Sequence, residues 1–259
     1  KQELSRSYNL EEISVDVKHV SKKFRLYHEN RTSVYESLVG TFSRKKHYEQ
    51  LNALDDVTFD VKKGEMFGII GRNGSGKTTL LKILSHIYQP DSGSVDVTGT
   101  IIPLLALGLG FHPELTASTN IVQSGILLGL SKKAITDRID DVIKFAELEK
   151  FADIKIKNFS AGMNMRLAFS TAMQINPDVL ILDEVLAVGD INFQKKSFDA
   201  IMDFKNRGKS VILVSHEMNT IHKFCDRALF LKDGKVEKIG TPDEAIASYV
   251  DFLDKDKSV

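Results

Sequence analysis

Apolar residues in the second half of the chain form short continuous runs, separated by segments whose apolar residues recur at helical spacing. The runs at 179–182 and 210–214 consist almost entirely of Val, Ile and Leu, a pattern typical of strands buried on both faces. Helices are expected around them, at 161–175, 193–204 and 218–224. Buried strands that alternate with helices predict an α/β fold, built on a mostly parallel sheet with both faces covered.

The rest of the chain predicts further elements by the same criteria. Strand patterns occur at 13–20, 57–61, 65–70, 95–97 and 101–105. Helical periodicity covers 77–87, 114–130 and 132–149. A hairpin is expected with strands at 227–231 and from Val236 onward, followed by a last helix with Thr241 as its cap and Pro242 as its first residue.

The segment 28–50 differs from its surroundings in charge and in pattern. From Lys18 to Lys46 there are eight Lys and Arg against two Glu, a local charge of 8 − 2 = +6. Within the segment, apolar residues recur at helical spacing from Val34 to Phe42, and the basic tail 44–46 follows. We expect a basic amphipathic helix; a solvated surface insertion explains the pattern equally well.

A glycine-rich loop lies between the predicted strand at 65–70 and the predicted helix at 77–87. Backbone N–H groups of such a loop turn inward onto phosphate oxygens, and the start of the helix adds partial positive charge. In this pattern Lys77 reaches the β- and γ-phosphates and the hydroxyl of Thr78 binds Mg²⁺. The sequence therefore predicts a nucleotide site formed by Gly71, Arg72, Asn73, Gly74, Ser75, Gly76, Lys77, Thr78 and Thr79.

Two later strands end in residues that suit phosphate chemistry. The apolar run 179–182 leads into Asp183 and Glu184, where Asp183 can hold Mg²⁺ and Glu184 can orient an attacking water as general base. The run 210–214 leads into His216. Since parallel sheets carry ligand sites at the carboxyl ends of strands, His216 is expected beside Asp183, if the two strands are neighbours, and in contact with the γ-phosphate.

Composition excludes several classes of protein. The chain has 259 residues with 35 Lys and Arg against 35 Asp and Glu, and this neutral balance argues against a general nucleic-acid binder. The best apolar stretch, 101–111, is too short to cross a membrane. The single cysteine, Cys225, indicates a reducing cytosol and is expected to be a core residue.

The sequence 159–163, Phe-Ser-Ala-Gly-Met, is the most discriminating element, because Ser160 and Gly162 match the Leu-Ser-Gly-Gly-Gln signature of ABC transporters. Over nearly its whole length the chain resembles the nucleotide-binding subunit of that family. The resemblance implies ATP and Mg²⁺ as cofactors and a head-to-tail homodimer, in which Ser160 and Gly162 contact the ATP of the partner. It further implies that Phe24 stacks on adenine, with Tyr27 as the alternative, and that 187–190 crosses between subunits.

The resemblance also implies the domain layout. One ABC ATPase domain would span 1–259, a phosphate-loop core with a mostly parallel sheet, an antiparallel β subdomain and a helical subdomain. The core with its β subdomain would take 1–113 and 176–240, the helical subdomain with the signature 114–175, and a C-terminal helix 241–259. One departure is the stretch 104–113, which lacks the Gln that usually binds Mg²⁺ and couples to the membrane partner. A backbone group, a water molecule or His112 remains as a candidate to replace this Gln.

Within the family, the stretches 107–116, 160–170, 183–190 and 193–196 resemble exporters of lipid-linked polysaccharides such as O-antigens and teichoic acids. That branch implies two transmembrane permease subunits as partners and a peripheral location on the cytoplasmic face of the inner membrane. There, 28–50 would face anionic lipid head groups. Because the chain ends at Val259, the sugar-binding domain that some relatives carry is expected to be absent or removed.

Three alternatives stay open at this point. One is an ABC ATPase for another transported substrate. Another is a soluble ABC ATPase of translation or DNA repair, although these usually join two such domains or carry long coiled coils. The third is a regulatory subunit without turnover, against which the intact Lys77, Asp183, Glu184 and His216 argue.

Overall fold

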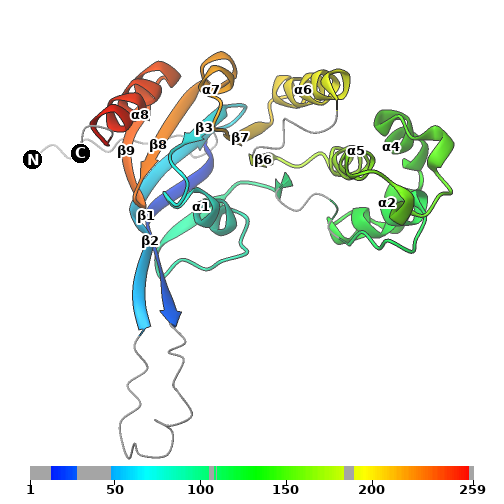
Figure 1. Ribbon diagram of the computed structural model, residues 1–259, viewed down its shortest axis with the longest axis horizontal. Helices are drawn as coiled ribbons and strands as arrows, with labels where there is room; N and C mark the ends of the chain where they lie inside the picture. The colour runs from blue at the N-terminus through cyan, green and yellow to red at the C-terminus, as the bar shows by residue number, and fades with distance from the viewer. Residues whose placement is uncertain (1–12, 28–47, 105–107, 109, 184–189, 257–259) are drawn as a thin grey trace, which may run out of the picture.

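The computed structural model describes residues 13–27, 48–104, 108, 110–183 and 190–256 (Figure 1). Glu184 and nearly all of the basic segment 28–50 lie outside these residues, as does most of the loop 187–190. Within the described part, the backbone forms two sheets and three groups of helices.

A six-stranded sheet with the order β5-β6-β7-β3-β8-β9 forms the centre of the molecule. Pairing is parallel from β5 through β8, and only β9 is antiparallel, so the predicted mostly parallel sheet is confirmed. The strands are β3 (Met66–Ile70), β5 (Ile101–Pro103), β6 (Val179–Asp183), β7 (Ser210–Val214), β8 (Arg227–Lys232) and β9 (Lys235–Gly240).

A second, antiparallel sheet contains β1 (Ile13–Tyr27) between β2 (Tyr48–Lys62) and β4 (Ser92–Val97). The pairing of β1 with β2 continues to Tyr27 opposite Tyr48, and the two strands extend well beyond the rest of the sheet (Figure 1). Residues 48–50, which the sequence assigned to the basic insertion, therefore belong to β2. Their backbone groups are satisfied by β1 in the register that places Arg25 opposite Gln50.

Helices cover the six-stranded sheet on one face, while α1 and the antiparallel sheet cover the other. Apolar side chains of the antiparallel sheet and α1 pack on one face of the parallel strands. The opposite face packs against the helices α5, α6, α7 and α8. The bounds are α1 (Lys77–Leu84), α5 (Ala161–Ala172), α6 (Ile191–Asn206), α7 (Met218–Phe224) and α8 (Pro242–Asp256). None of the helices in the described ranges has the length and apolar character needed to cross a bilayer.

The helical unit on one side of the molecule has its own core, formed with α5 by α2 (Ala117–Leu127), α3 (Lys132–Thr136) and α4 (Ile139–Ala146). The single helix expected over 132–149 is wrong. It breaks at Arg138, whose N–H bonds the Ile135 carbonyl three residues back and whose guanidinium donates to the Gln174 carbonyl at 2.5 Å. It also ends early, because Glu147 adopts the left-handed conformation with φ of 60°.

Candidate functional site

The glycine-rich loop connects the buried end of β3 to the first residue of α1. A Cβ at Gly71 would lie 2.3 Å from the Leu231 carbonyl oxygen, and one at Gly76 would lie 2.5 Å from the carbonyl oxygen of Ala53. Both glycines are therefore required by close backbone approach. Gly74, with φ of +81°, faces open space, since a Cβ added there would have no atom within 4 Å. The loop thus presents bare backbone to a cavity.

Lys77 lies under this loop with its ammonium group folded back onto the chain. Its Nζ donates to the carbonyl oxygens of Gly71 at 2.7 Å and Arg72 at 2.9 Å. The hydroxyl of Ser75 is buried without a hydrogen-bond partner among the described residues. A cation held at the centre of a loop that also buries an unsatisfied hydroxyl is suited to an anionic ligand.

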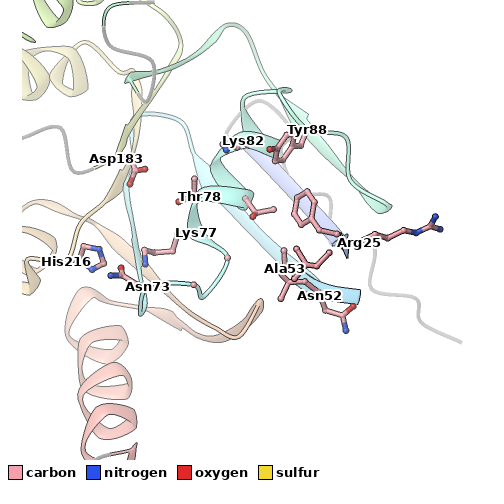
Figure 2. A pocket seen from close by; sticks show the side chains of 16 residues that line it. Arg25, Asn52, Ala53, Asn73, Lys77, Thr78, Lys82, Tyr88, Asp183 and His216 are labelled. Atoms are coloured by element: carbon pink, nitrogen blue, oxygen red, sulfur yellow. The ribbon is translucent and has the colours of Figure 1, made fainter. Parts of the chain in front are cut away.

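Asp183 and His216 come together because their strands are neighbours, as expected from the sequence. Asp183 is opposite Val214 in the parallel β6–β7 pair, so both strands end at the same edge of the sheet. Both side chains line the cavity next to the glycine-rich loop, together with Lys77 and Thr78 (Figure 2). Glu184 follows Asp183 directly but lies outside the described residues.

The cavity has a volume of about 740 Å³ and runs from these polar residues to an aromatic corner. Phe24 of β1 lines the far part, with its ring centroid 5.7 Å from that of Tyr88 in an edge-to-face arrangement. Arg25 and Asn52 lie at this end, opposite Asp183 and His216 (Figure 2). The side chain of Tyr27 lies outside the described residues.

Sequence reasoning missed the cavity residues Tyr88, Lys82, Asn52 and Arg25. Tyr88 carried a weak signal, since it is an aromatic residue just beyond the helix that follows the glycine-rich loop. Asn52 carried none, because its place beside the cavity depends on the pairing of β2 with β1, in which Asn52 is opposite Lys23.

The cavity fits a nucleoside triphosphate with a divalent cation. The bare loop, the Lys77 ammonium and the start of α1 suit phosphates. The oxygens of Thr78 and Asp183 are ligands of the kind that Mg²⁺ prefers. At the other end, the Phe24 and Tyr88 rings offer an apolar, aromatic surface of the kind on which a base stacks.

Ser160 and Gly162 line a different hollow, of about 440 Å³, and not the cavity of Lys77. Ser160 is the cap of α5, and its hydroxyl accepts a hydrogen bond from the Met163 N–H at 3.2 Å. Arg166 and Asp190 line the same hollow and form an ion pair. The pKa of Asp190 is lowered, first by the hydrogen bond that its carboxylate accepts from the Phe193 N–H and then by the positive charge of Arg166.

His112 does not line the cavity of Lys77. The fully buried Asn120 holds the backbone of His112, because its side chain accepts from the His112 N–H at 2.6 Å and donates to the His112 carbonyl at 3.2 Å. Cys225 is buried, as expected, and burial raises the pKa of its thiol to about 12, which disfavours the reactive thiolate.

Comparison with known proteins gives the same picture. The family described as ABC transporter matches residues 54–187. An O-antigen export system ATP-binding protein from Klebsiella pneumoniae is 40% identical over 240 residues, 91% of this chain and 96% of that protein. The protein of the same name from Myxococcus xanthus is 46% identical over 199 residues, 77% of this chain and 46% of its own length. The teichoic acids export ATP-binding protein of Bacillus anthracis is 38% identical over 241 residues, 93% of this chain and 43% of its own length.

The chain thus spans nearly the whole of one curated relative and less than half of two others. Among solved structures, the dimeric ATP-binding cassette MJ0796, in a post-hydrolysis state bound to ADP and Pi, is similar with a TM-score of 0.68. It is 26% identical, and 88% of this chain and 98% of that chain are covered. The family match across half of the chain and the near full-length relative show that this chain belongs to the ABC transporter family.

Proposed function

We propose that the chain is the ATP-binding and ATP-hydrolysing subunit of an exporter of a lipid-linked polysaccharide, either O-antigen or teichoic acid. The observation that carries ATP hydrolysis is the single cavity that holds Lys77, Thr78, Asp183 and His216 at one end and Phe24 at the other. The names of the relatives support the transported class, since they describe O-antigen and teichoic acid export.

In this proposal, the residues of the cavity have separate roles in binding or hydrolysing ATP. The backbone of the loop 71–79 and the Lys77 ammonium bind the β- and γ-phosphates, and Phe24 stacks on adenine. Thr78 and Asp183 hold Mg²⁺, which neutralises charge on the phosphate oxygens. His216 contacts the γ-phosphate. Glu184 orients the attacking water by accepting a hydrogen bond from it, and takes its proton as the water oxygen attacks the γ-phosphorus.

Assembly completes the proposal. Two copies form a head-to-tail dimer in which Ser160 and Gly162 of each copy contact the γ-phosphate held by the other. The dimer binds two transmembrane permease subunits at the cytoplasmic face of the membrane. The basic segment 28–50 contacts lipid head groups there.

The hydrolytic role is tested by Glu184→Gln. This variant should keep ATP affinity, lose nearly all phosphate release and accumulate as a closed dimer in size-exclusion chromatography with ATP. Glu237→Gln makes the same chemical change on the exposed side of β9 and should leave both measurements unchanged. Normal phosphate release by the Glu184 variant would refute the assigned role.

The export role is tested separately, with residues outside the cavity. Replacing Arg44, Lys45 and Lys46 by Glu should reduce flotation with vesicles rich in anionic lipid and reduce polysaccharide export in cells, while ATP hydrolysis by the isolated subunit stays normal. Equal loss of hydrolysis would indicate a folding role for the segment. Cofractionation of the unaltered chain with ribosomes instead of membranes would favour the translation alternative.

A further inference from the structure

The segment 85–91 connects α1 to β4 along the chain, and its hydrogen bonds reach β1, the strand that carries Phe24. At its start, the N–H groups of Ile87 and Tyr88 both donate to the Lys82 carbonyl, at 2.8 and 3.1 Å. At its end, the N–H of Asp91 donates to the Ser21 carbonyl of β1 at 2.9 Å. The backbone of the segment is therefore fastened at both ends.

The Asp91 side chain strengthens the attachment to β1. Its carboxylate accepts from the Lys22 ammonium at 2.8 Å and from the N–H of Lys23 at 2.7 Å. These bonds, the Lys22 side chain first, lower the pKa of Asp91. The two residues that precede Phe24 are thus held by the segment, and the position of Phe24 along β1 is set relative to α1.

Tyr88, whose N–H belongs to the first attachment, contacts Phe24 directly with its ring. The ring planes meet at 63° with centroids 5.7 Å apart, and the Lys82 ammonium lies 5.2 Å from the Tyr88 centroid. Tyr88 is partly buried, and both rings line the cavity. Figure 2 shows the side chains of Tyr88 and Lys82 next to each other, with the hydroxyl of Tyr88 on the side of Lys82.

We propose that Tyr88 is a positioning residue for base binding, which holds the Phe24 ring at a set angle so that the base meets a preformed stacking surface. The proposal rests on the proposed function, in which Phe24 stacks on adenine. The ring of a phenylalanine rotates broadly about its last side-chain bond, and an edge-to-face neighbour restricts that rotation. A base that stacks on a restricted ring loses less conformational entropy on binding.

The test is a double-mutant cycle between Tyr88→Leu and Phe24→Leu, with Tyr88→Phe as the conservative control. Binding is measured for ATP and for inorganic tripolyphosphate, which has the phosphates and no base. We expect Tyr88→Leu to weaken ATP binding by about threefold to tenfold, the range of an aromatic pair, with tripolyphosphate binding unchanged. It should raise KM without lowering kcat, and Tyr88→Phe should bind ATP within about twofold of the unaltered chain.

The effect of Tyr88→Leu in a chain that already carries Phe24→Leu distinguishes positioning of the Phe24 ring from direct contact between Tyr88 and the base. In the Phe24→Leu chain, Tyr88→Leu should have less than half of its original effect on ATP affinity. An equal effect in both backgrounds would overturn the proposal, as would an equal loss of tripolyphosphate binding or no loss for ATP at all. If Phe24→Leu itself left ATP affinity unchanged, the inference would fail while hydrolysis at Lys77 and Glu184 would stand.

Discussion

The guanidinium of Arg166 pairs with the carboxylate of Asp190 and so joins α5 to the first turn of α6. The same guanidinium donates to Glu147 at 3.2 Å and lies 5.1 Å from the ring centroid of Phe193. Asp190 in turn caps α6, since its side chain accepts from the N–H groups of Asn192 and Phe193. Arg166 therefore connects α5, the helix capped by Ser160, with the end of the loop that is expected to cross between subunits.

Arg166→Ala should loosen this connection. The packing on the fully buried Phe193 accounts for most of the lost stability, about 1 kcal/mol, because ion pairs open to solvent contribute little. ATP hydrolysis should fall further than ATP binding, since the signature and the loop end are no longer held together. Urea unfolding and phosphate release measure the two effects. Lys157→Ala, which breaks an exposed pair with Glu114 in the same helical unit, is the control, and equal effects of both would contradict the prediction.

Ser160→Ala separates the role of Ser160 as a helix cap from its proposed contact with the partner's ATP. Loss of the hydrogen bond to the Met163 N–H should cost about 1 kcal/mol of stability. Ser131→Ala is a matched control, because Ser131 caps α3 through the Ala134 N–H at the same distance of 3.2 Å. Both variants should lose similar stability, and only Ser160→Ala should lose ATP-dependent dimerisation. Similar dimerisation of the two would leave Ser160 as a cap alone.

Lys77→Ala removes the ammonium at the centre of the glycine-rich loop. A charge-assisted bond to phosphate is about twice as strong as a neutral one, so ATP affinity should fall by roughly tenfold or more. The variant should also lose about 1 kcal/mol of stability, because the Lys77 ammonium donates to the carbonyl oxygens of Gly71 and Arg72 and the bond to Gly71 is buried. Titration with ATP followed by calorimetry measures the loss. Lys63→Ala, an exposed charge just before β3, should bind ATP normally.

The sequence predicted the phosphate end of the cavity because each of its parts is local. The glycine-rich loop, the strand before Asp183 and the strand before His216 are each recognisable within about ten residues, and parallel pairing of β6 and β7 brings their ends together. The start of the helix after Ser160, expected at 161, is local in the same sense. What the sequence supplied without resemblance was a nucleotide site on a parallel sheet.

The parts that sequence reasoning missed depend on contacts between distant segments. The contact of Tyr88 with Phe24 follows from the attachment of 85–91 to β1. Arg138, where the expected helix breaks, donates to the carbonyl of Gln174, which lies just beyond the end of α5. The full length of β1 and β2 follows from their pairing with each other, and no apolar alternation in 48–52 indicates it. The local sequence pattern predicts none of these three features, because contacts with a distant segment of the chain supply the free energy that stabilises each of them.

Acid should weaken the edge of the parallel sheet through Asp178. Its carboxylate accepts from the Lys209 ammonium at 2.7 Å and from the Thr100 N–H at 2.8 Å, and so ties together the starts of β5, β6 and β7. These bonds, that of Lys209 first, hold the pKa of Asp178 below its ordinary value of 3.8. The unfolded chain therefore binds the proton more readily, so the contribution to stability is present above pH 3.8 and is lost as the pH falls through the lowered pKa.

Asp178→Asn should consequently cost about 1 kcal/mol near neutral pH, a modest value because the side chain is 44% exposed and the charge is screened. The difference from the unaltered chain should narrow once the pH falls below 3.8, where the carboxylate of the unaltered chain becomes protonated as well. Urea unfolding along a pH series measures both, with Asp199→Asn on the exposed side of α6 as the control for a change of one charge. A difference that stayed constant through this acid range would mean that the hydrogen-bond geometry, and not the charge of Asp178, holds the three strands together.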